Sequence, residues 1–307
     1  MQVTRKAWRW WMVAAGLACA AAVSHATAAP AVDPLRVESL TVEQARELAS
    51  RKAPLQFNAL VAIDAAVAAE LAKHEGTICF TVLTELSPEA ARALAAHKPT
   101  KGFGQFDLEF RTLRLITPET AAALTAHVGN LRLPALERLG SPELARKLAG
   151  QWGELKVGVT ELSPEIAAIL ATNEGVFEDR TRPNVVTRRA DQSRSVLWFA
   201  GLRHLEPPVA ESMAAHQGVL VLNELTELSP EAAAALARRK GGSLILNGLD
   251  RLSPATAAAL AAYDGEIALR GLRDLSPEAA TALAAHRGRL HLSRGVDVRP
   301  VAGRPSP

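Results

Sequence analysis

The sequence predicts an α/β fold in which short strand–turn–helix units stack on one another as a solenoid. Three observations predict it: the motif Leu-Ser-Pro-Glu recurs, two apolar residues separated by one residue precede each copy, and an Ala-rich stretch follows. The period of about 23 residues suits one strand and one helix, whereas an all-helical solenoid, the alternative, usually needs more than about 30. We expect a parallel sheet on one face and short helices on the other.

The first residues of the motif copies mark the repeat: Leu40, Ile63, Leu86, Ile116, Leu139, Leu162, Leu205, Leu228, Leu252 and Leu275. Most spacings are 23 or 24 residues. One spacing of 30 holds an insertion at 99–105, and one spacing of 43 is close to two periods. We therefore expect about 11 units over residues 29–292, one of them degenerate near 175–197, and a disordered tail at 293–307.

Each unit opens with a very short strand. Apolar residues stand eight and six positions before the motif, as in Leu220 and Leu222, and this alternation points both side chains into the core. A third apolar residue, such as Leu225, stands three positions before the motif. Because one unit cannot bury its apolar edge alone, we expect leucine to stack on leucine, each burial contributing about 1.5–3 kcal/mol.

The motif itself starts a helix. Its serine is an N-cap, its proline takes the first helical position, and its glutamate complements the helix dipole. The Ala-rich stretch favours a helix of about ten residues. A glycine after the helix predicts a left-handed stop, at Gly76, Gly129, Gly175, Gly218, Gly241, Gly265 and Gly288.

The pattern resembles the leucine-rich repeat family over about residues 32–296. It is most similar to a bacterial variant with L-x-L-N-x-L-x-x-L-S-P-E-x-A-x-x-L units, of which Leu220–Leu236 is the best copy. The commonest pattern of that family has Asn or Cys three residues after the second strand leucine, whereas Asn58, Asn223 and Asn247 follow the strand directly, which puts a regular asparagine ladder in question. The resemblance implies macromolecular binding on the concave sheet and implies no catalysis.

Residues 1–28 have the parts of a secretory signal peptide: a positive start, an apolar run at 10–23 and small residues at 26–28. Two alternatives are an uncleaved anchor and a lipid on Cys19. We expect a secreted, periplasmic or envelope protein with no stable membrane span after signal removal. Cys79 is then the only cysteine and cannot form an internal disulfide.

The charge balance argues against nucleic acid as a partner. The formal net charge is +3, and the signal segment holds three basic and no acidic residues. Without that segment the chain is formally neutral, so no strong overall attraction to phosphate is expected.

Two recurring columns of polar residues have structural explanations. Histidines near the helix ends could align for metal binding, but we expect them to bond the last carbonyls and complement the helix dipole, in a column broken at Lys240 and Asp264. The second column, glutamate at the second helical position, is explained by the helix dipole. No nucleophile, metal or phosphate motif accompanies either column, so we expect no cofactor and no enzyme. The histidines are His74, His97, His127, His216 and His286, and the glutamates are Glu89, Glu119, Glu143, Glu165, Glu231 and Glu278.

The outward strand residues are the best binding candidates. Seven positions before the motif they are Gln56, Cys79, Glu109, Arg132, Trp198, Val221, Ile245, Ala268 and His291, with Lys156 at the shifted equivalent. We single out Arg132, Lys156, Trp198, Val221 and Ile245 as a binding face, charged at one end and apolar at the other. The alternative is that a loop or another copy covers this face. Arg180, Arg182, Arg188 and Arg189 form a possible basic docking loop.

These observations predict a non-enzymatic scaffold, secreted or associated with the envelope, that binds a protein or surface polymer on its sheet face. The first alternative is a structural envelope protein that self-associates without a specific ligand. A hydrolase is a further alternative, for which the sequence offers no constellation of catalytic residues.

Overall fold

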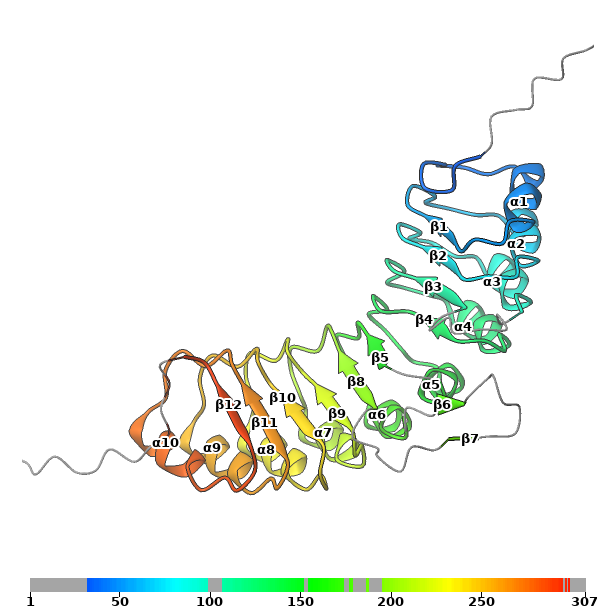
Figure 1. The fold of residues 1–307 in the computed structure, drawn as a ribbon. Helices are drawn as coiled ribbons and strands as arrows, with labels where there is room; N and C mark the ends of the chain where they lie inside the picture. The colour runs from blue at the N-terminus through cyan, green and yellow to red at the C-terminus, as the bar shows by residue number, and fades with distance from the viewer. Residues whose placement is uncertain are drawn as a thin grey trace, which may run out of the picture. The chain divides into compact units, whose positions relative to one another are not determined.

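The computed structural model describes residues 32–98, 107–151, 154–173, 177–178, 186–187, 195–294, 296 and 298. Over these residues the chain is an α/β repeat protein, in which helices and short strands alternate in regular layers (Figure 1). The predicted signal segment with Cys19, the insertion at 99–105, the basic loop with Arg180, Arg182, Arg188 and Arg189, and most of the predicted tail lie outside the described residues.

The strands form two parallel sheets. The first has the order β1-β2-β3-β4: β1 (Leu55–Phe57), β2 (Ile78–Phe80), β3 (Leu108–Phe110) and β4 (Leu131–Arg132). The second has the order β12-β11-β10-β9-β8-β5: β5 (Glu154–Val157), β8 (Val196–Phe199), β9 (Val219–Val221), β10 (Ser243–Ile245), β11 (Glu266–Leu269) and β12 (Leu290–Leu292). Within each sheet the strands pair in the order in which their units follow one another along the chain, as the repeat predicts.

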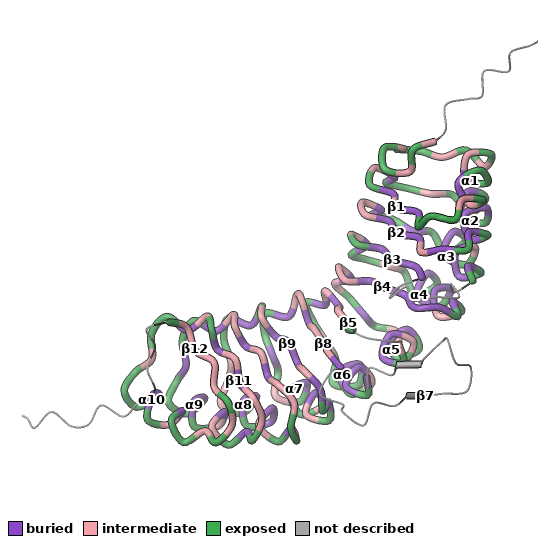
Figure 2. Tube along the Cα trace, viewed as in Figure 1, coloured by how far each residue is buried: buried purple, intermediate pink, exposed green. Residues whose placement is uncertain are grey.

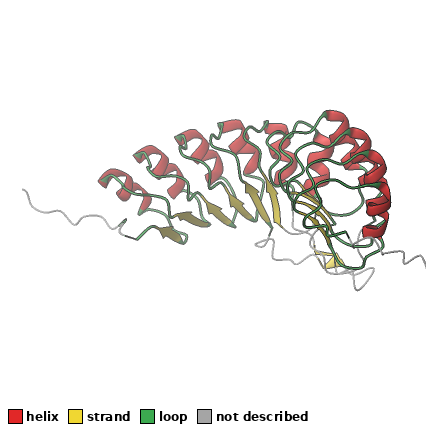
Figure 3. Cartoon of the chain, turned by 90° about the horizontal axis from the view of Figure 1, so that it is seen from above, coloured by secondary structure: helices red, strands yellow, loops and turns green. Residues whose placement is uncertain are grey.

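The helices lie on one side of the strands (Figure 3), and each packs against the next along the chain. They are α1 (Val42–Ala49), α2 (Ala65–Leu71), α3 (Pro88–Ala95), α4 (Pro118–Thr125), α5 (Pro142–Ala149), α6 (Pro164–Ala171), α7 (Pro207–Met213), α8 (Pro230–Ala237), α9 (Pro254–Ala261) and α10 (Pro277–Leu283). With seven or eight residues each, they are shorter than the ten residues predicted. Among the described residues no helix is long and apolar enough to cross a membrane.

The strand register confirms the predicted columns. Ile78 pairs with Leu108, and Leu244 pairs with Ile267, so the inward positions of successive strands stack. The outward residues pair in the same order, including Lys156 with Trp198. We call a strand together with the helix that follows it a layer.

The prediction of a degenerate repeat unit near 175–197 is wrong. Strand β5 pairs directly with β8, with Leu155 opposite Leu197, and α6 packs on α7, so the stack has no layer between them. The described part of the intervening segment is a short antiparallel pair, β6 (Phe177–Glu178) with β7 (Val186–Thr187). The spacing of 43 is therefore one period plus an insertion.

The core lies between strands and helices, where Figure 2 shows the buried stretches in purple. Leucines of the third apolar position, such as Leu83 and Leu113, are fully buried. In the first sheet the second of the two inward positions, the last residue of β1, β2 and β3, is phenylalanine. The rings of Phe57, Phe80 and Phe110 stack with successive centroid separations of 5.3 Å. Stacked aromatic rings add to the stability that burial gives.

The helix starts follow the predicted chemistry. The Ser87 side chain accepts the Ala90 N–H, and Pro88 opens α3; the Ser229 side chain does the same for Ala232 in α8. The acidic residue at the second helical position is Glu89 in α3 and Glu231 in α8. Helix α7 is the exception, because its N-cap Glu206 makes no capping hydrogen bond through its side chain.

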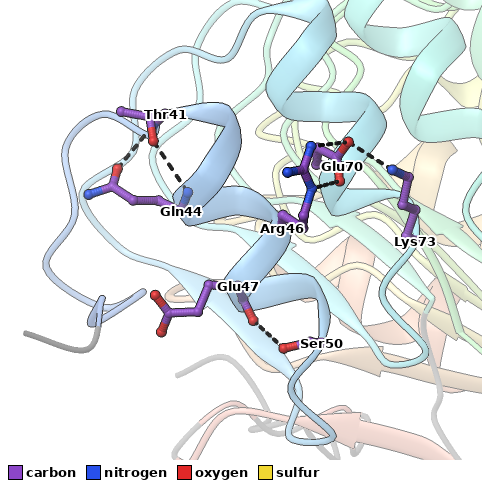
Figure 4. Close-up of polar contacts among 7 residues, drawn as sticks. All are labelled: Thr41, Gln44, Arg46, Glu47, Ser50, Glu70 and Lys73. Carbon is purple, nitrogen blue, oxygen red and sulfur yellow. Dashed lines mark hydrogen bonds and ion pairs between the residues drawn. The ribbon is translucent and has the colours of Figure 1, made fainter. Parts of the chain in front are cut away.

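The first two helices are joined by side chains (Figure 4). Thr41 Oγ1 accepts the Gln44 N–H, while Gln44 Oε1 accepts the Thr41 N–H, which completes a capping box at α1. On the neighbouring α2, Glu70 receives Lys73 Nζ at 2.7 Å and Arg46 Nε at 3.3 Å. These hydrogen bonds, that of Lys73 first, hold the pKa of Glu70 below its usual value and tie α1 to α2.

The helix ends differ from the prediction. Their C-cap residues, such as Ala96 and Ala126, have right-handed backbone, and positive φ occurs among the described glycines at Gly241 and Gly242. Several other glycines, including Gly218, Gly265 and Gly288, lie against the backbone of the preceding layer. A methyl group at Gly218 would overlap the Ser195 carbonyl oxygen of the preceding strand segment. Gly241 has the predicted left-handed backbone, but α8 already ends at Ala237 with the right-handed C-cap Arg238, so Gly241 is not the residue that stops the helix. The predicted stop at Gly175 lies outside the described residues.

Candidate functional site

The outward face of the second sheet is unusually apolar around β8 and β10. Val196, Trp198, Val219, Ile245 and Ala268 point away from the helices and are each half-buried. We call these five residues the apolar face patch. A sheet face open to water normally carries polar side chains, so a contiguous apolar set marks a surface suited to contact.

Val221 does not belong to the accessible surface. It lies in register between Trp198 and Ile245, but only 6% of it is exposed. Its larger half-buried neighbours on both adjacent strands cover it. The prediction of Val221 as a contact residue is therefore wrong, while Trp198 and Ile245 keep accessible surface.

Lys156 and Trp198 form a pair at one edge of the patch. They are opposite each other on β5 and β8, and Lys156 Nζ lies 3.9 Å from the centroid of the indole ring. This is a cation–π contact, which positions the ammonium group over the ring. Trp198 Nε1 is buried and has no hydrogen-bond partner among the described residues. The pair joins a positive charge to an apolar surface.

Arg132 belongs to a different cluster. It lies in the first sheet, on β4, next to Glu109 of β3, and its Nη1 is 3.5 Å from Glu109 Oε1. Arg111 Nε donates to Glu109 Oε2 at 3.2 Å. Because β4 and β5 belong to separate sheets, strand pairing does not bring Arg132 beside Lys156. The charge of Glu109, which is 6% exposed, is thus balanced within the sheet face.

Cys79 completes this cluster and is a poor nucleophile. Its Sγ donates to Glu109 Oε2 at 3.3 Å, and the residue is 6% exposed. Burial, followed by the negative charge of Glu109, raises the pKa of the Cys79 thiol to about 11. The thiol therefore stays protonated at neutral pH, as expected for an inert cysteine.

The far end of the sheet face is polar. His291 Nε2 lies 2.5 Å from Glu266 Oε1, and Ser243 Oγ donates to Glu266 Oε2 at 3.0 Å. The hydrogen bond from Ser243, followed by that from His291, lowers the pKa of Glu266. These contacts bridge β10, β11 and β12 and border the apolar face patch.

A second column stands two or three residues after the ends of helices α2 to α10, and sequence analysis described it only in part. We call it the interlayer column: His74, His97, His127, Gln151, Asn173, His216, Arg239, Tyr263 and His286. The four histidines of its first eight members are each 1% exposed. Burial is the main cause that lowers the pKa of each of these histidines, to about 4 for His127 and His216. The rings are therefore uncharged at neutral pH, and they do not complement the helix dipoles as the sequence analysis expected.

Several members of the interlayer column form hydrogen bonds to the backbone of the preceding layer. His97 Nε2 lies 2.8 Å from the Gly76 carbonyl oxygen, and Asn173 Nδ2 donates to the Ala149 carbonyl oxygen at 2.9 Å. The predicted break at Lys240 and Asp264 is wrong, because the residue before each of them, Arg239 or Tyr263, fills the position. Counting a constant eleven positions from the first residue of each motif, from Leu228 to Arg239 and from Leu252 to Tyr263, finds them.

Arg239 and Tyr263 serve the same purpose as the histidines. Arg239, 2% exposed, donates from Nη2 to the Gly218 carbonyl oxygen at 2.6 Å and from Nε to the His216 carbonyl oxygen at 3.1 Å. The Tyr263 hydroxyl donates to the Gly241 carbonyl oxygen at 2.6 Å. Carbonyls left without partners at the helix ends and loops are thereby satisfied.

Asparagine bonding across the strands is local. Asn223 Oδ1 accepts the Asn247 N–H at 3.2 Å, and Asn247 Oδ1 accepts the Arg270 N–H at 2.9 Å. The two adjacent asparagines thus make a ladder of two steps. In the first sheet the position of these asparagines is held by other residues. Arg111 donates its N–H to the Phe80 carbonyl oxygen. Pro134 has no N–H to donate, and β4 ends before it, at Arg132.

The chemistry available at the helix starts is limited. A hollow of about 600 Å³ is lined by Glu227, Asp250, Ser253 and Thr256, among others. The Ser253 side chain already accepts the Thr256 N–H, and the Thr256 hydroxyl donates to the Leu228 carbonyl oxygen at 3.0 Å. Within the described ranges no three His, Cys, Asp or Glu side chains are grouped to hold a metal ion.

The fold and the sheet face define a repeat protein of alternating strands and helices with a partly apolar outer sheet surface. No protein-family model matches the sequence, and no curated protein matches it.

Proposed function

We propose that the chain is a non-enzymatic interaction scaffold, a solenoid of the leucine-rich repeat kind that is secreted or held at the cell envelope. Its sheet face binds a protein or a surface polymer. The contact is centred on Trp198 and Ile245, with Lys156 at its edge and Arg132 on the neighbouring sheet.

One observation carries the proposal. The apolar face patch spans four adjacent strands, β8 to β11, on the side of the sheet that the helices leave open (Figure 3). Keeping apolar side chains half-exposed at five outward positions on four adjacent strands has no purpose for the core, since the inward leucines already fill it. Tryptophan is among the residues that most often carry the binding energy of an interface.

The test is affinity capture from an envelope extract with the purified chain as bait. The variant Trp198→Ala/Ile245→Ser is expected to lose the partners that the wild type captures, with an unchanged circular dichroism spectrum. The matched control is Leu115→Ser/Val128→Ser, which removes apolar residues that are 60% and 80% exposed elsewhere. Equal capture by the wild type and the sheet-face variant removes this site.

A second candidate, self-association, is favoured by the last strand. Leu290 and Leu292 of β12 occupy inward positions but are only half-buried, whereas Leu244 and Leu246 at the same positions two layers earlier are fully buried. Light scattering of the purified chain distinguishes the candidates. A monomer that captures a defined partner contradicts the structural role, and a concentration-dependent oligomer without a partner supports it.

A further inference from the structure

The interlayer column places proton-binding groups in the interior of the first layers. His74, His97 and His127 come from the ends of α2, α3 and α4, and each is 1% exposed. The rings of His97 and His127 have their centroids 5.8 Å apart. In later layers the same position holds Arg239, Tyr263 and His286. The charge of Arg239 and Tyr263 does not change between about pH 4 and 8, and His286 is only half-buried, unlike the three histidines of the first layers. The binding function proposed above uses none of these groups.

The hydrogen bonds of His97 and His74 show that these two rings are built into the stack in the neutral form, and both ring nitrogens of His127 are buried without a hydrogen-bond partner among the described residues. The Gly76 carbonyl oxygen can only accept, so the facing nitrogen, His97 Nε2, carries the proton. His97 Nδ1 is buried and has no hydrogen-bond partner in the described part of the chain. At His74 the arrangement is reversed: Nδ1 faces the Ala49 carbonyl oxygen at 3.3 Å, and Nε2 is the nitrogen without a partner.

A second proton would therefore put a charge and an unsatisfied donor into the core, which is costly. Asp107, fully buried, faces His97 and His127 and favours their protonation, but its Oδ2 already accepts the Asn130 N–H at 2.7 Å. Lys147 opposes protonation of His127, whereas Glu75 favours that of His74. Burial outweighs the carboxylates, since it is the largest influence on the pKa of all three rings and lowers it.

We propose that the histidines of the interlayer column are an acid-sensitive device, which opens the layers of β1–β4 in mildly acidic solution before the layers of β10–β12 open. The opened chain can take up protons that the closed stack excludes. Because each layer contacts only its neighbours, part of a stack can open by itself.

The direction and size of the effect follow from proton linkage. An exposed histidine has a pKa of about 6.5, so above that pH neither state binds the proton and stability is unaffected. As the pH falls below about 6.5, the opened state is favoured, by up to about thirtyfold at pH 5 for each histidine that stays neutral in the fold. Three consecutive layers carry such a ring at the first sheet. In the second sheet His216 is the fully buried member, and it lies outside β10–β12.

The experiment is hydrogen exchange of the full wild-type chain, followed by mass spectrometry, at about pH 7.5, 6 and 5. Exchange times are corrected for the intrinsic pH dependence of the amides. Peptides within 55–132 are expected to lose at least tenfold more protection on acidification than peptides within 243–292. Equal loss in both regions, or no loss in either, overturns the proposal.

Variants add a second readout, and Asn173 provides the model for them. It occupies the same column, is 3% exposed and bonds the preceding layer through an uncharged amide. His97→Asn/His127→Asn is expected to abolish most of the acid sensitivity of residues 55–132, while the control His204→Asn, at an exposed position outside the column, keeps it. Full acid sensitivity in the double variant contradicts the proposal. Should that variant not fold, the wild-type exchange data decide alone.

Discussion

Glycine spacing between layers can be tested by substitution. The proposed change is Gly218→Ala. An added Cβ would overlap the carbonyl oxygen and the hydroxyl of Ser195, which precedes β8. That carbonyl accepts the Val219 N–H at 2.7 Å, so the methyl group and an existing hydrogen bond compete for the same space. The backbone of Gly218 is not left-handed, and alanine is disfavoured there only by the neighbouring layer.

The magnitude follows from the contacts. Forcing an extra methyl group into a packed interior costs about 1–3 kcal/mol, and a strained or lost hydrogen bond adds about 1 kcal/mol. Replacing glycine by alanine also restricts the unfolded chain, which returns about 0.4–1 kcal/mol. Gly218→Ala should therefore lower the free energy of unfolding by about 1–3 kcal/mol.

Two other glycines separate the possible causes. A Cβ on Gly140 meets nothing within 4 Å, so Gly140→Ala should stabilise the chain by about 0.4–1 kcal/mol. Gly241 has φ +72° and also nothing within 4 Å, so Gly241→Ala should cost about 1–2 kcal/mol through backbone strain alone.

The assay is urea unfolding of the three variants, followed by far-UV circular dichroism. A stability of Gly218→Ala equal to that of Gly140→Ala would refute the close-approach explanation.

Three further predictions concern caps, packing and the thiol. Ser229→Ala should cost about 1 kcal/mol by removing the N-cap of α8, whereas Glu206→Ala, at a cap without such a bond, should change the urea midpoint very little. Leu236→Ala, at a fully buried position, should cost about 2–5 kcal/mol through a cavity, and a loss below that of Ser229→Ala would contradict the stacking register. Cys79 should resist a thiol reagent at neutral pH until the chain is unfolded, because its pKa is raised to about 11; fast labelling of the native chain would show that the residue is accessible.

The repeat could be predicted because its signals are local. The Ser-Pro-Glu helix starts depend on hydrogen bonds within four residues, and the strand positions depend on an alternation within three. Identical spacing then aligns equal positions in successive layers, as at Leu244 and Ile267. The candidate face was found for the same reason. The pairing of Lys156 with Trp198 was not predicted, because a degenerate layer was expected between their strands.

The misplaced features all depend on neighbours that are distant along the chain. Spacing alone does not distinguish a degenerate layer from an insertion between β5 and β8, because both have the same length. Val221 has the sequence position of a surface residue, yet its neighbours on the adjacent strands bury it. The glycines after the helices occupy positions typical of a left-handed stop, but what they avoid is the backbone of the preceding layer.

The sequence by itself thus determined the period, the order of the layers and the inward and outward sides of each strand, since these follow from contacts within one unit. Only the tertiary structure decided which outward residues stay accessible and that His74 and His97 are buried against carbonyls of the preceding layer. Burial depends on several layers together. A side chain is shielded from water by residues of the adjacent layers, and the residue type at its own position does not specify how large those neighbouring side chains are.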